Sequence, residues 1–358
     1  MHSTSNQDYR NDDDCDNGNH AVATNEETTI PDSIACPQQV TDICFHTTKP
    51  AIIVGDILGK VTLYSYDDEG KVHELRTHEH HKKTIRCVRV TADGQTMFTA
   101  GKDKSWCKVD LESGALLHEQ SKAHEGAIYS AEVIDSNVML TGDEDGVIKM
   151  WDMRRLPGPV MELKENDDYI SDMVCHDDRK HLLVSSGDGT LSCVNIKNRK
   201  LELQSELFDS DFLSLAIMKN ASKVVCGDGD GTLQIFNWGE WGNVSDRYPG
   251  HSGSIDSMLP LSEDVICTGC EDGKLRLVHI LPNSIESIIG SHGDFPIQSL
   301  TLSHDGALIA SASHDEHVKF WKTPDVDKVT VGSHSKRKGK KVGKHEKLKE
   351  RKAFFNDL

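Results

Sequence analysis

Histidine and cysteine residues occur in two short clusters whose spacing is compatible with metal binding or redox chemistry. His78, His80 and His81 stand close together, but no matching group of ligands follows them. Cys267 and Cys270 have a C-x-x-C spacing without the second pair of a structural zinc site. We therefore interpret the histidines as part of an exposed loop and the cysteines as the end of a strand, and we predict no metal site.

Two glycine-containing stretches match catalytic motifs only in part. The stretch 250–254, GHSGS, lacks the closing glycine of a nucleophile elbow. The stretch 227–231, GDGDG, is not followed by the helix that a phosphate-binding loop requires. The sequence thus predicts no catalytic residue and no cofactor, and it favours a protein that binds over one that catalyses.

These stretches belong to a unit that recurs along the chain. Each unit contains a turn followed by a short strand, as in DGVIKMWD and DGTLQIFN. Seven copies follow at intervals of 42–45 residues, beginning at Leu58, Asp103, Asp145, Asp188, Asp230, Asp272 and Asp315. This period is typical of propeller blades, which bury their faces only against one another. We predict an all-β fold with seven blades of four antiparallel strands.

The third copy indicates how one unit supplies four strands. Strands are predicted over 128–133, 138–141, 147–151 and 160–163, with a tight Asp-Gly turn between the second and the third. Closure of the ring requires a strand from the opposite end of the chain. Two segments compete for this role, residues 28–34 and residues 326–331, and either would cover an exposed sheet edge.

Charge divides the chain into three parts. Residues 1–32 carry eight acidic residues and one basic residue, and residues 336–358 carry ten basic and three acidic residues, within a net charge of −18. The disc between the two ends is therefore acidic, which favours basic protein partners. We predict a disordered acidic segment over 1–27, the propeller over 28–331 and a basic flexible tail over 332–358.

The basic tail has a cationic start and an apolar end. The dense cations are typical of a nuclear-localisation segment and comprise Lys336, Arg337, Lys338, Lys340 and Lys341. The apolar end offers Phe354, Phe355 and Leu358 to a partner groove. We predict a nuclear protein, with the cytoplasm as a second compartment, whose tail contacts RNA phosphates weakly and without sequence recognition.

Neither a secretory signal nor a membrane-spanning run is visible. The first thirty residues are polar and acidic, and no apolar run approaches the length that a bilayer requires. Ten cysteines are scattered, mostly in strand-like positions, which favours reduced thiols inside the cell over a disulfide framework. We expect no membrane partner and a monomeric propeller.

The repeated unit resembles the WD-repeat family. In that family a loop histidine, a strand serine or threonine, a turn aspartate and a strand tryptophan form a buried hydrogen-bonded relay. The resemblance implies two complete relays, formed by His124, Thr141, Asp145 and Trp151 in the third copy and by His292, Ser311, Asp315 and Trp321 in the last. The second and sixth copies keep the histidine and the aspartate but have Val109 and Val278 in place of the tryptophan, so these copies are expected to depend more on apolar packing.

The third copy ends in a WDxR pattern formed by Trp151, Asp152 and Arg154. This ending resembles the receptor box of WD-repeat substrate receptors of cullin–RING ubiquitin ligases. The other interpretation is an ordinary blade end whose arginine faces solvent, because Trp-Asp is common to the whole superfamily. The resemblance therefore implies a ligase receptor as an alternative function.

Other stretches are more specific than the superfamily pattern. KVVCGDGDGTLQIFNW over 223–238, ILPN over 280–283 and the paired phenylalanines of the tail resemble the family of WD repeat-containing protein 55 and its homologs. The resemblance covers residues 31–321 and the end of the tail. It implies a non-enzymatic nuclear and nucleolar propeller that supports ribosomal RNA synthesis and processing and ribosome biogenesis.

The loops before the inner strands offer a surface to such partners. Their acidic and aromatic residues are Asp167, Asp168, Tyr169, Asp209, Asp211, Asp294 and Phe295. An acidic rim with isolated aromatic side chains suits proteins rich in arginine and lysine. We expect the partners to be basic components of ribosome assembly.

Overall fold

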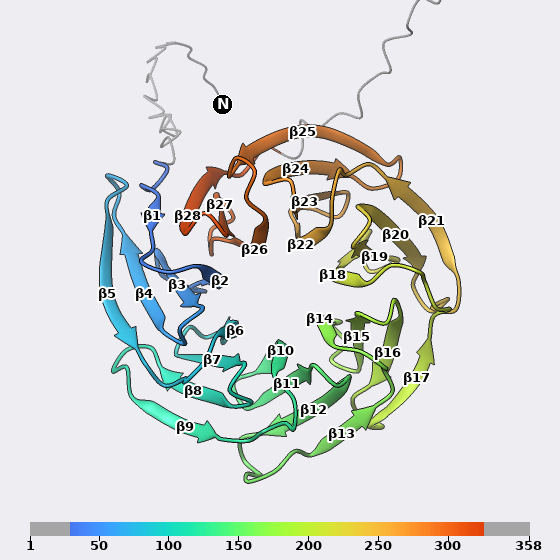
Figure 1. Cartoon of the computed structure of the whole chain (residues 1–358), viewed down its shortest axis with the longest axis horizontal. Helices are drawn as coiled ribbons and strands as arrows, with labels where there is room; N and C mark the ends of the chain where they lie inside the picture. Colours follow the sequence, from blue (N-terminus) through green and yellow to red (C-terminus); the bar gives the residue numbers. More distant parts are fainter. Residues whose placement is uncertain (1–28, 326–358) are drawn as a thin grey trace, which may run out of the picture.

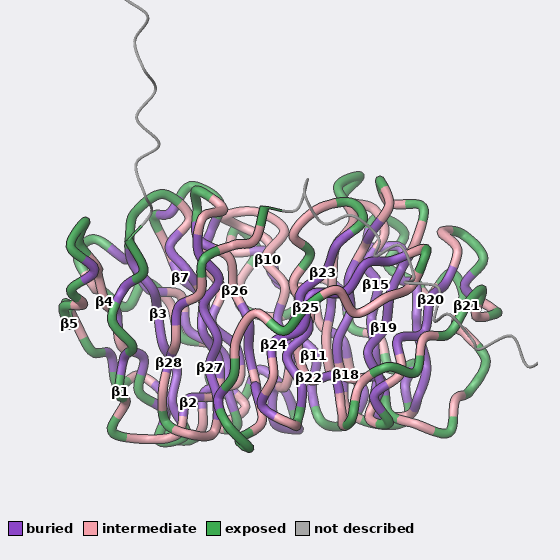
Figure 2. The backbone as a smooth tube through the Cα atoms, turned by 90° about the horizontal axis from the view of Figure 1, so that it is seen from above, coloured by how far each residue is buried: buried purple, intermediate pink, exposed green. Residues whose placement is uncertain are grey.

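The computed structural model describes residues 29–325, and all regular structure in this range is β-strand. Seven four-stranded antiparallel sheets form the blades of a ring around a central axis (Figure 1). In the side view, buried residues follow the strands and most exposed residues lie in the turns at both ends of the disc (Figure 2). The predicted fold class and the number of blades are confirmed.

Each of the first six blades is built from four consecutive strands, the innermost first. The first blade contains β2 (Val40–Phe45), β3 (Ala51–Asp56), β4 (Val61–Tyr66) and β5 (Val72–His78), and the second contains β6 (Ile85–Val90), β7 (Thr96–Gly101), β8 (Trp106–Asp110) and β9 (Leu116–Gln120). The third contains β10 (Ile128–Asp135), β11 (Val138–Asp143), β12 (Val147–Asp152) and β13 (Met161–Lys164). The fourth contains β14 (Ile170–Cys175), β15 (His181–Ser186), β16 (Leu191–Asn195) and β17 (Lys200–Gln204).

The remaining three blades follow the same order. The fifth contains β18 (Phe212–Met218), β19 (Lys223–Asp228), β20 (Thr232–Asn237) and β21 (Val244–Pro249), and the sixth contains β22 (Ile255–Pro260), β23 (Val265–Cys270), β24 (Lys274–His279) and β25 (Ser284–Ser291). The seventh joins β26 (Ile297–Leu302), β27 (Leu308–Ser313) and β28 (His317–Lys322) to β1 (Ile34–Ala35). The repeat therefore maps onto the blades, with one strand exchanged at the closure.

Local sequence explains where the strands begin and end. In the third blade, every strand starts and stops within two residues of its predicted bounds. Gly146, in the predicted turn between β11 and β12, has a φ of 79°, and a Cβ atom there would collide with the carbonyl oxygen of Asn166. Both features require glycine, so the Asp-Gly pair is needed for the turn itself.

The hydrophobic core lies largely between neighbouring blades. Ile53 of the first blade, for example, packs in one buried cluster with Ile85 and Met97 of the second. Full burial of one such side chain stabilises the fold by about 1.5–3 kcal/mol. Because each blade covers a face of the next, a blade removed from the ring would expose apolar surface on both sides.

The ring is closed by the N-terminal candidate segment. Strand β1 pairs antiparallel with β28, with Ile34 opposite Val318 and Ala35 opposite His317. In Figure 1, β1 lies beside β28 at the junction of the first and last blades. Of the predicted closing segment 28–34, only the last residue, Ile34, belongs to the strand that pairs with the last blade. The competing segment 326–331 lies outside the described residues. The predicted segments 1–27 and 332–358, with the residues of the tail, also lie outside them.

The third blade contains a buried relay in which one predicted member is wrong. His124 Nδ1 lies 2.8 Å from Asp143 Oδ2, and His124 Nε2 lies 2.7 Å from Thr141 Oγ1. Trp151 Nε1 donates to the same hydroxyl at 2.8 Å. Asp145 does not bind the histidine, because Asp143, at the end of β11, contacts the imidazole ring instead. Asp143 also accepts the backbone N–H of Asp145. The aspartate of this relay is therefore a strand residue.

The seventh blade forms its relay as predicted. His292 Nδ1 lies 2.8 Å from Asp315 Oδ2, and His292 Nε2 lies 2.8 Å from Ser311 Oγ. Trp321 Nε1 donates to Ser311 Oγ at 2.7 Å. The last residue of β27 is Ser313, whose side chain is too short to contact the imidazole of His292. The turn aspartate Asp315 therefore binds this histidine. The relay geometry thus depends on which residue ends the second strand.

The second and sixth blades differ although both keep the histidine and the aspartate. His81 contacts Asp103 at 3.1 Å and Thr99 at 2.9 Å, so that relay lacks only the tryptophan. In the sixth blade, Asp272 instead accepts two hydrogen bonds from Arg276, at 2.8 and 2.5 Å. The guanidinium takes the carboxylate that the histidine would otherwise bind.

Candidate functional site: the acidic rim and the central channel

One end of the disc carries two sets of loops from every blade. These are the loops before the inner strands and the loops between the second and third strands. Backbone hydrogen bonds tie the two sets together, as from Gly187 N to Tyr169 O at 2.9 Å and from Gly229 N to Asp211 O at 3.0 Å. We call this end of the disc the rim. Its loops are held in fixed positions on the rigid blades, which suits them for recognition.

Charge on the rim is concentrated in one sector. The loops of the fourth and fifth blades carry six aspartates, namely Asp167, Asp168, Asp188, Asp209, Asp211 and Asp230, and neither lysine nor arginine. We call these residues the acidic rim. The corresponding loops of the second blade contain Lys82, Lys83, Lys102 and Lys104. The charge of the rim therefore differs from one side of the disc to the other, with an acidic sector on the fourth and fifth blades and a lysine-rich sector on the second.

The structure brings together the predicted residues of the fourth and fifth blades. Asp167 N donates to Asp188 Oδ2 at 2.9 Å, which fixes one loop against the next. The Tyr169 hydroxyl donates to Asp211 Oδ2 at 3.3 Å, which joins the two blades. Asp294 lies on the seventh blade and is not part of this group; its neighbour Phe295 is 51% exposed. The predicted surface thus consists of one continuous part and one separate loop.

Two further features of the rim were not predicted from the sequence. The side chain of Leu207, in the loop before β18, is 76% exposed among the rim aspartates. The Arg86 guanidinium lies 4.6 Å from the centre of the Tyr129 ring, which in turn lies 5.3 Å from the Tyr169 ring. Arg86 and Tyr129 occupy the same position in their repeats, directly after the first residue of the inner strand. Alignment of the repeats at that position was the signal that could have revealed this row.

A channel runs along the axis of the disc. It has a volume of about 1120 Å³ and is lined by all seven inner strands. Arg86, Tyr129 and Tyr169 line it at the rim, and His176 and Glu263 line it at the opposite end. The channel therefore connects the rim with the far face of the disc.

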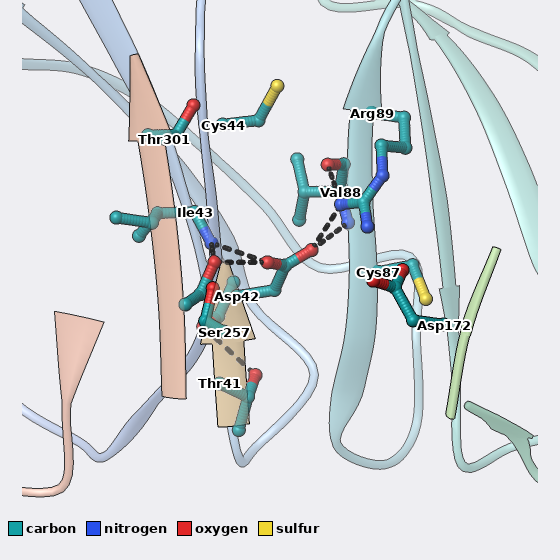
Figure 3. A network of polar contacts seen from close by, with 12 residues as sticks. Thr41, Asp42, Ile43, Cys44, Cys87, Val88, Arg89, Asp172, Ser257 and Thr301 are labelled. Carbon is teal, nitrogen blue, oxygen red and sulfur yellow. Dashed lines mark hydrogen bonds and ion pairs between the residues drawn. The ribbon is translucent and has the colours of Figure 1, made fainter. Parts of the chain in front are cut away.

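A network of hydrogen bonds around Asp42 joins three blades at the channel wall. Asp42 Oδ2 accepts from Val88 N and from the Arg89 guanidinium, both at 2.8 Å, and Oδ1 accepts from Ser299 Oγ at 2.7 Å (Figure 3). Ile43 N adds a bond of 3.0 Å to Oδ1. The first, second and seventh blades are thus tied to one carboxylate next to the point of ring closure.

Equivalent positions on other inner strands make similar contacts between blades. Asp42, Asp172, Ser257 and Ser299 each follow a register shift at the start of their strand. Asp172 Oδ2 accepts from Leu215 N at 2.9 Å, as Asp42 does from the second blade. A β-bulge turns these side chains toward the next blade, so the same position ties several neighbouring blades together.

The channel wall also contains two carboxyl groups that form no ion pair within the described residues. Burial raises the pKa of Glu132 to about 7, against the opposing charge of Arg89, and the pKa of Asp172 to about 6, against the hydrogen bond from Leu215 N and the charge of Arg89. Glu132 Oε1 accepts a single hydrogen bond, from Cys175 N at 3.2 Å. Burial therefore favours the protonated form of both groups, and Glu132 has acceptor capacity left for a partner's donor group.

Burial suppresses the reactivity of four cysteines in the described part of the chain, two in the channel wall and two in β23. Cys44 and Cys87 line the channel, and burial raises their thiol pKa values to about 11 and about 12. Cys267 and Cys270 lie in β23 and are fully buried, and burial raises the pKa of Cys270 to about 12. A protonated, buried thiol is a poor nucleophile and a poor metal ligand.

One histidine–carboxylate group escaped the sequence prediction. His176, Asp178 and His181 come together in the turn between β14 and β15. His181 Nδ1 lies 2.5 Å from Asp178 Oδ2, and His176 Nδ1 accepts the backbone N–H of Asp178 at 3.1 Å. The His176 ring also packs 4.3 Å from the Trp238 ring. Since both Nδ1 atoms already have partners within the turn, the arrangement supports the turn itself. The H-x-D-x-x-H spacing was its visible signal.

The WDxR residues differ in their access to solvent. Trp151 is buried in the relay, and Asp152 is also buried. The Arg154 guanidinium is 64% exposed and donates to both Asp152 oxygens, at 2.8 and 2.9 Å. Only Arg154 can therefore contact a partner directly, and it lies at the end of the disc opposite to the rim.

The seven blades, the partial relays and the loop-lined rim define a WD-repeat propeller, a class of protein-interaction scaffolds. Residues 29–325 include no helix that is long and apolar enough to cross a bilayer.

Comparison with known proteins identifies the family. A sequence model of WDR55 matches residues 31–326. The chain is 39% identical over 326 residues to WD repeat-containing protein 55 of Rattus norvegicus, which covers 91% of this chain and 84% of the relative. It is 40% identical over 302 residues to the Homo sapiens protein, with 84% and 79% covered. A homolog in Drosophila persimilis is 39% identical over 300 residues, with 84% and 59% covered. The chain belongs to the WDR55 family, which confirms the predicted resemblance.

Proposed function

We propose that this protein is a non-enzymatic nuclear and nucleolar scaffold that supports ribosomal RNA synthesis and processing and ribosome biogenesis. In this proposal, basic proteins of ribosome assembly bind to the acidic rim. Nuclear import through the cations between Lys336 and Lys341 is part of the same proposal. The observation that carries it is the concentration of six aspartates, without a basic residue, in the rim loops of two neighbouring blades.

The chemistry of the rim favours arginine- and lysine-rich partners. Exposed carboxylates attract cations over a distance and raise the rate of association. Tyr169 and Phe295 supply aromatic contacts, which contribute strongly to binding energy when a partner covers them. Glu132 in the channel adds a carboxyl group that can accept a hydrogen bond from a partner below the rim. Long-range attraction and local anchoring therefore act on the same class of partner.

Charge reversal on the rim tests the proposal. The variant Asp168→Lys/Asp211→Lys/Asp294→Lys is compared with Asp68→Lys/Glu112→Lys/Asp177→Lys, which changes the net charge equally at exposed turns of the opposite end. Affinity purification from nuclei followed by mass spectrometry reads both. We expect the recovery of basic assembly proteins to fall roughly tenfold with the rim variant only, because this variant loses several charges that attract a basic partner. Equal recovery from both variants would exclude the rim as the binding surface.

The ligase-receptor alternative rests on the exposure of the Arg154 guanidinium. The same purification with Arg154→Ala addresses it, because the substitution removes a group that pairs with carboxylates of an adaptor. An adaptor that is recovered with the wild type and lost with this variant would favour the alternative. Absence of any adaptor from the wild-type sample would exclude it.

A further inference from the structure

A small pocket with basic surroundings lies between the third and fourth blades. It has a volume of about 340 Å³ and lies where the inner strands end, opposite to the rim. Apolar side chains line it, among them Ile134, Met150 and Ile196. The pocket is therefore large enough for a flat group of moderate size, with an apolar surface to receive it.

Cations outnumber acids around this pocket. Its charged residues are Arg154, Arg155, Arg179, Lys197, Arg199, Asp135 and Asp152. Asp152 is occupied by Arg154, and Asp135 accepts the backbone N–H groups of its own turn. The surplus of positive charge is a local exception in a chain whose net charge is −18.

Three of the cations have no partner in the described part of the chain. The exposed side chains of Arg179, Lys197 and Arg199 form neither an ion pair nor a hydrogen bond with any of residues 29–325. Arg155 approaches Asp152 only at 3.9 Å. Three unpaired cations held on two adjacent turns repel one another, and an anionic ligand would relieve that repulsion.

The combination of features selects among anions. Several cations on separate turns match negative charges that are spaced along a chain, whereas a single phosphate would use only one or two of them. The apolar pocket accepts an unstacked base, which a single strand offers and a duplex keeps within its stack. The chemistry thus matches a phosphate backbone with accessible bases.

We propose that this pocket binds single-stranded nucleic acid. Arg179, Lys197 and Arg199 contact successive phosphates, and one base lies against Met150. This inference is independent of the rim proposal, since the pocket lies at the opposite end of the strands and has the opposite charge. The disc would then carry a nucleic-acid site and a site for basic proteins on different faces.

Binding of a labelled single-stranded RNA and of the matching DNA, each about 12 nucleotides long, to the full chain tests the inference. The variant Arg179→Gln/Lys197→Gln/Arg199→Gln is compared with Lys82→Gln/Lys83→Gln/Lys102→Gln, which removes the same charge from the rim of the second blade. The basic tail is present in both and affects them equally. Circular dichroism melting checks that both variants stay folded.

We expect the pocket variant to bind about tenfold more weakly at low salt, and the slope of log Kd against log salt to fall by about 2, since each phosphate contact on a single strand contributes about 0.7. The control should change Kd less than about twofold. Weaker binding of the pocket variant supports the inference whether or not RNA and DNA bind with different Kd values. A difference between the two Kd values would identify a preference for one sugar. Equal weakening in both variants, equal binding of a duplex, or equal competition by a polyglutamate peptide would overturn the inference.

Discussion

The third and fifth blades have the same backbone arrangement but different interiors. In the third, His124, Thr141 and Trp151 form a polar relay. In the fifth, strand pairing and loop position place Phe208, Cys226 and Phe236 at these three sites. The Phe208 and Phe236 rings lie 6.0 Å apart, and each also packs against Phe212. A blade therefore does not need the relay, provided that its interior is filled.

One element is common to both blades. The last residue of the second strand is an aspartate, Asp143 or Asp228, whose Oδ1 accepts two backbone N–H groups of the following turn. Its Oδ2 binds His124 in the third blade and Gln234 Nε2, at 2.9 Å, in the fifth. The turn cap is thus kept while its side-chain partner changes. The turn therefore requires the aspartate, whereas the side chain that binds its second carboxylate oxygen can differ between blades.

The largest effect is expected from Phe236→Ala in the fifth blade. Phe236 is fully buried, and its removal leaves a cavity that the surrounding rings cannot fill. The free energy of unfolding should fall by about 3–5 kcal/mol. Denaturant unfolding measures this, with Leu203→Ala, at an exposed position of β17, as the control. A loss below about 1 kcal/mol would mean that aromatic packing does not replace the relay.

An intermediate effect is expected from Thr141→Val in the third blade. The change keeps the shape of the side chain but leaves His124 Nε2 and Trp151 Nε1 without their shared hydroxyl. Two unsatisfied buried groups should lower the free energy of unfolding by about 2–4 kcal/mol. Thr141→Ser is the matched control, because the seventh blade uses Ser311 at the same position. Equal losses for valine and serine would show that the relay contributes only packing.

The smallest effect depends on pH and concerns the channel side of the same two blades. Glu132 of β10 corresponds to Ala216 of β18, and burial raises the pKa of Glu132 to about 7. A carboxyl whose pKa is higher in the folded state stabilises the fold at low pH, and this contribution is lost as pH rises from about 4.5 to 7. Glu132→Gln should therefore match the wild type near pH 4 and exceed it by about 1–3 kcal/mol at pH 8.

Denaturant unfolding at both pH values measures this effect, and Glu162→Gln, on the exposed outer strand β13, serves as the control. Glutamine keeps the acceptor for Cys175 N, so the difference isolates the charge. If Glu132→Gln shifts stability equally at both pH values, the channel does not disfavour the ionised carboxyl.

Much of the candidate site was visible as residue types but not as an arrangement. The acidic and aromatic residues of the rim loops were identified from their position before each inner strand. That Tyr169 binds Asp211, while Asp294 remains on a distant blade, depends on the order of blades around the ring. The basic pocket was not predicted, because its cations come from turns of two blades that share no sequence pattern.

The sequence by itself determined the number of blades, the place of most strands, the seventh-blade relay and the family. These follow from a local pattern repeated at a fixed period, and each copy needs only its own turn and strand residues. Tertiary structure decided that Asp143 and not Asp145 binds His124, and that Asp42 joins residues of three blades, with Ser299 lying 257 positions away. Such contacts depend on how strand ends and neighbouring blades face one another, and the spacing of residues along the chain carries no information about that orientation.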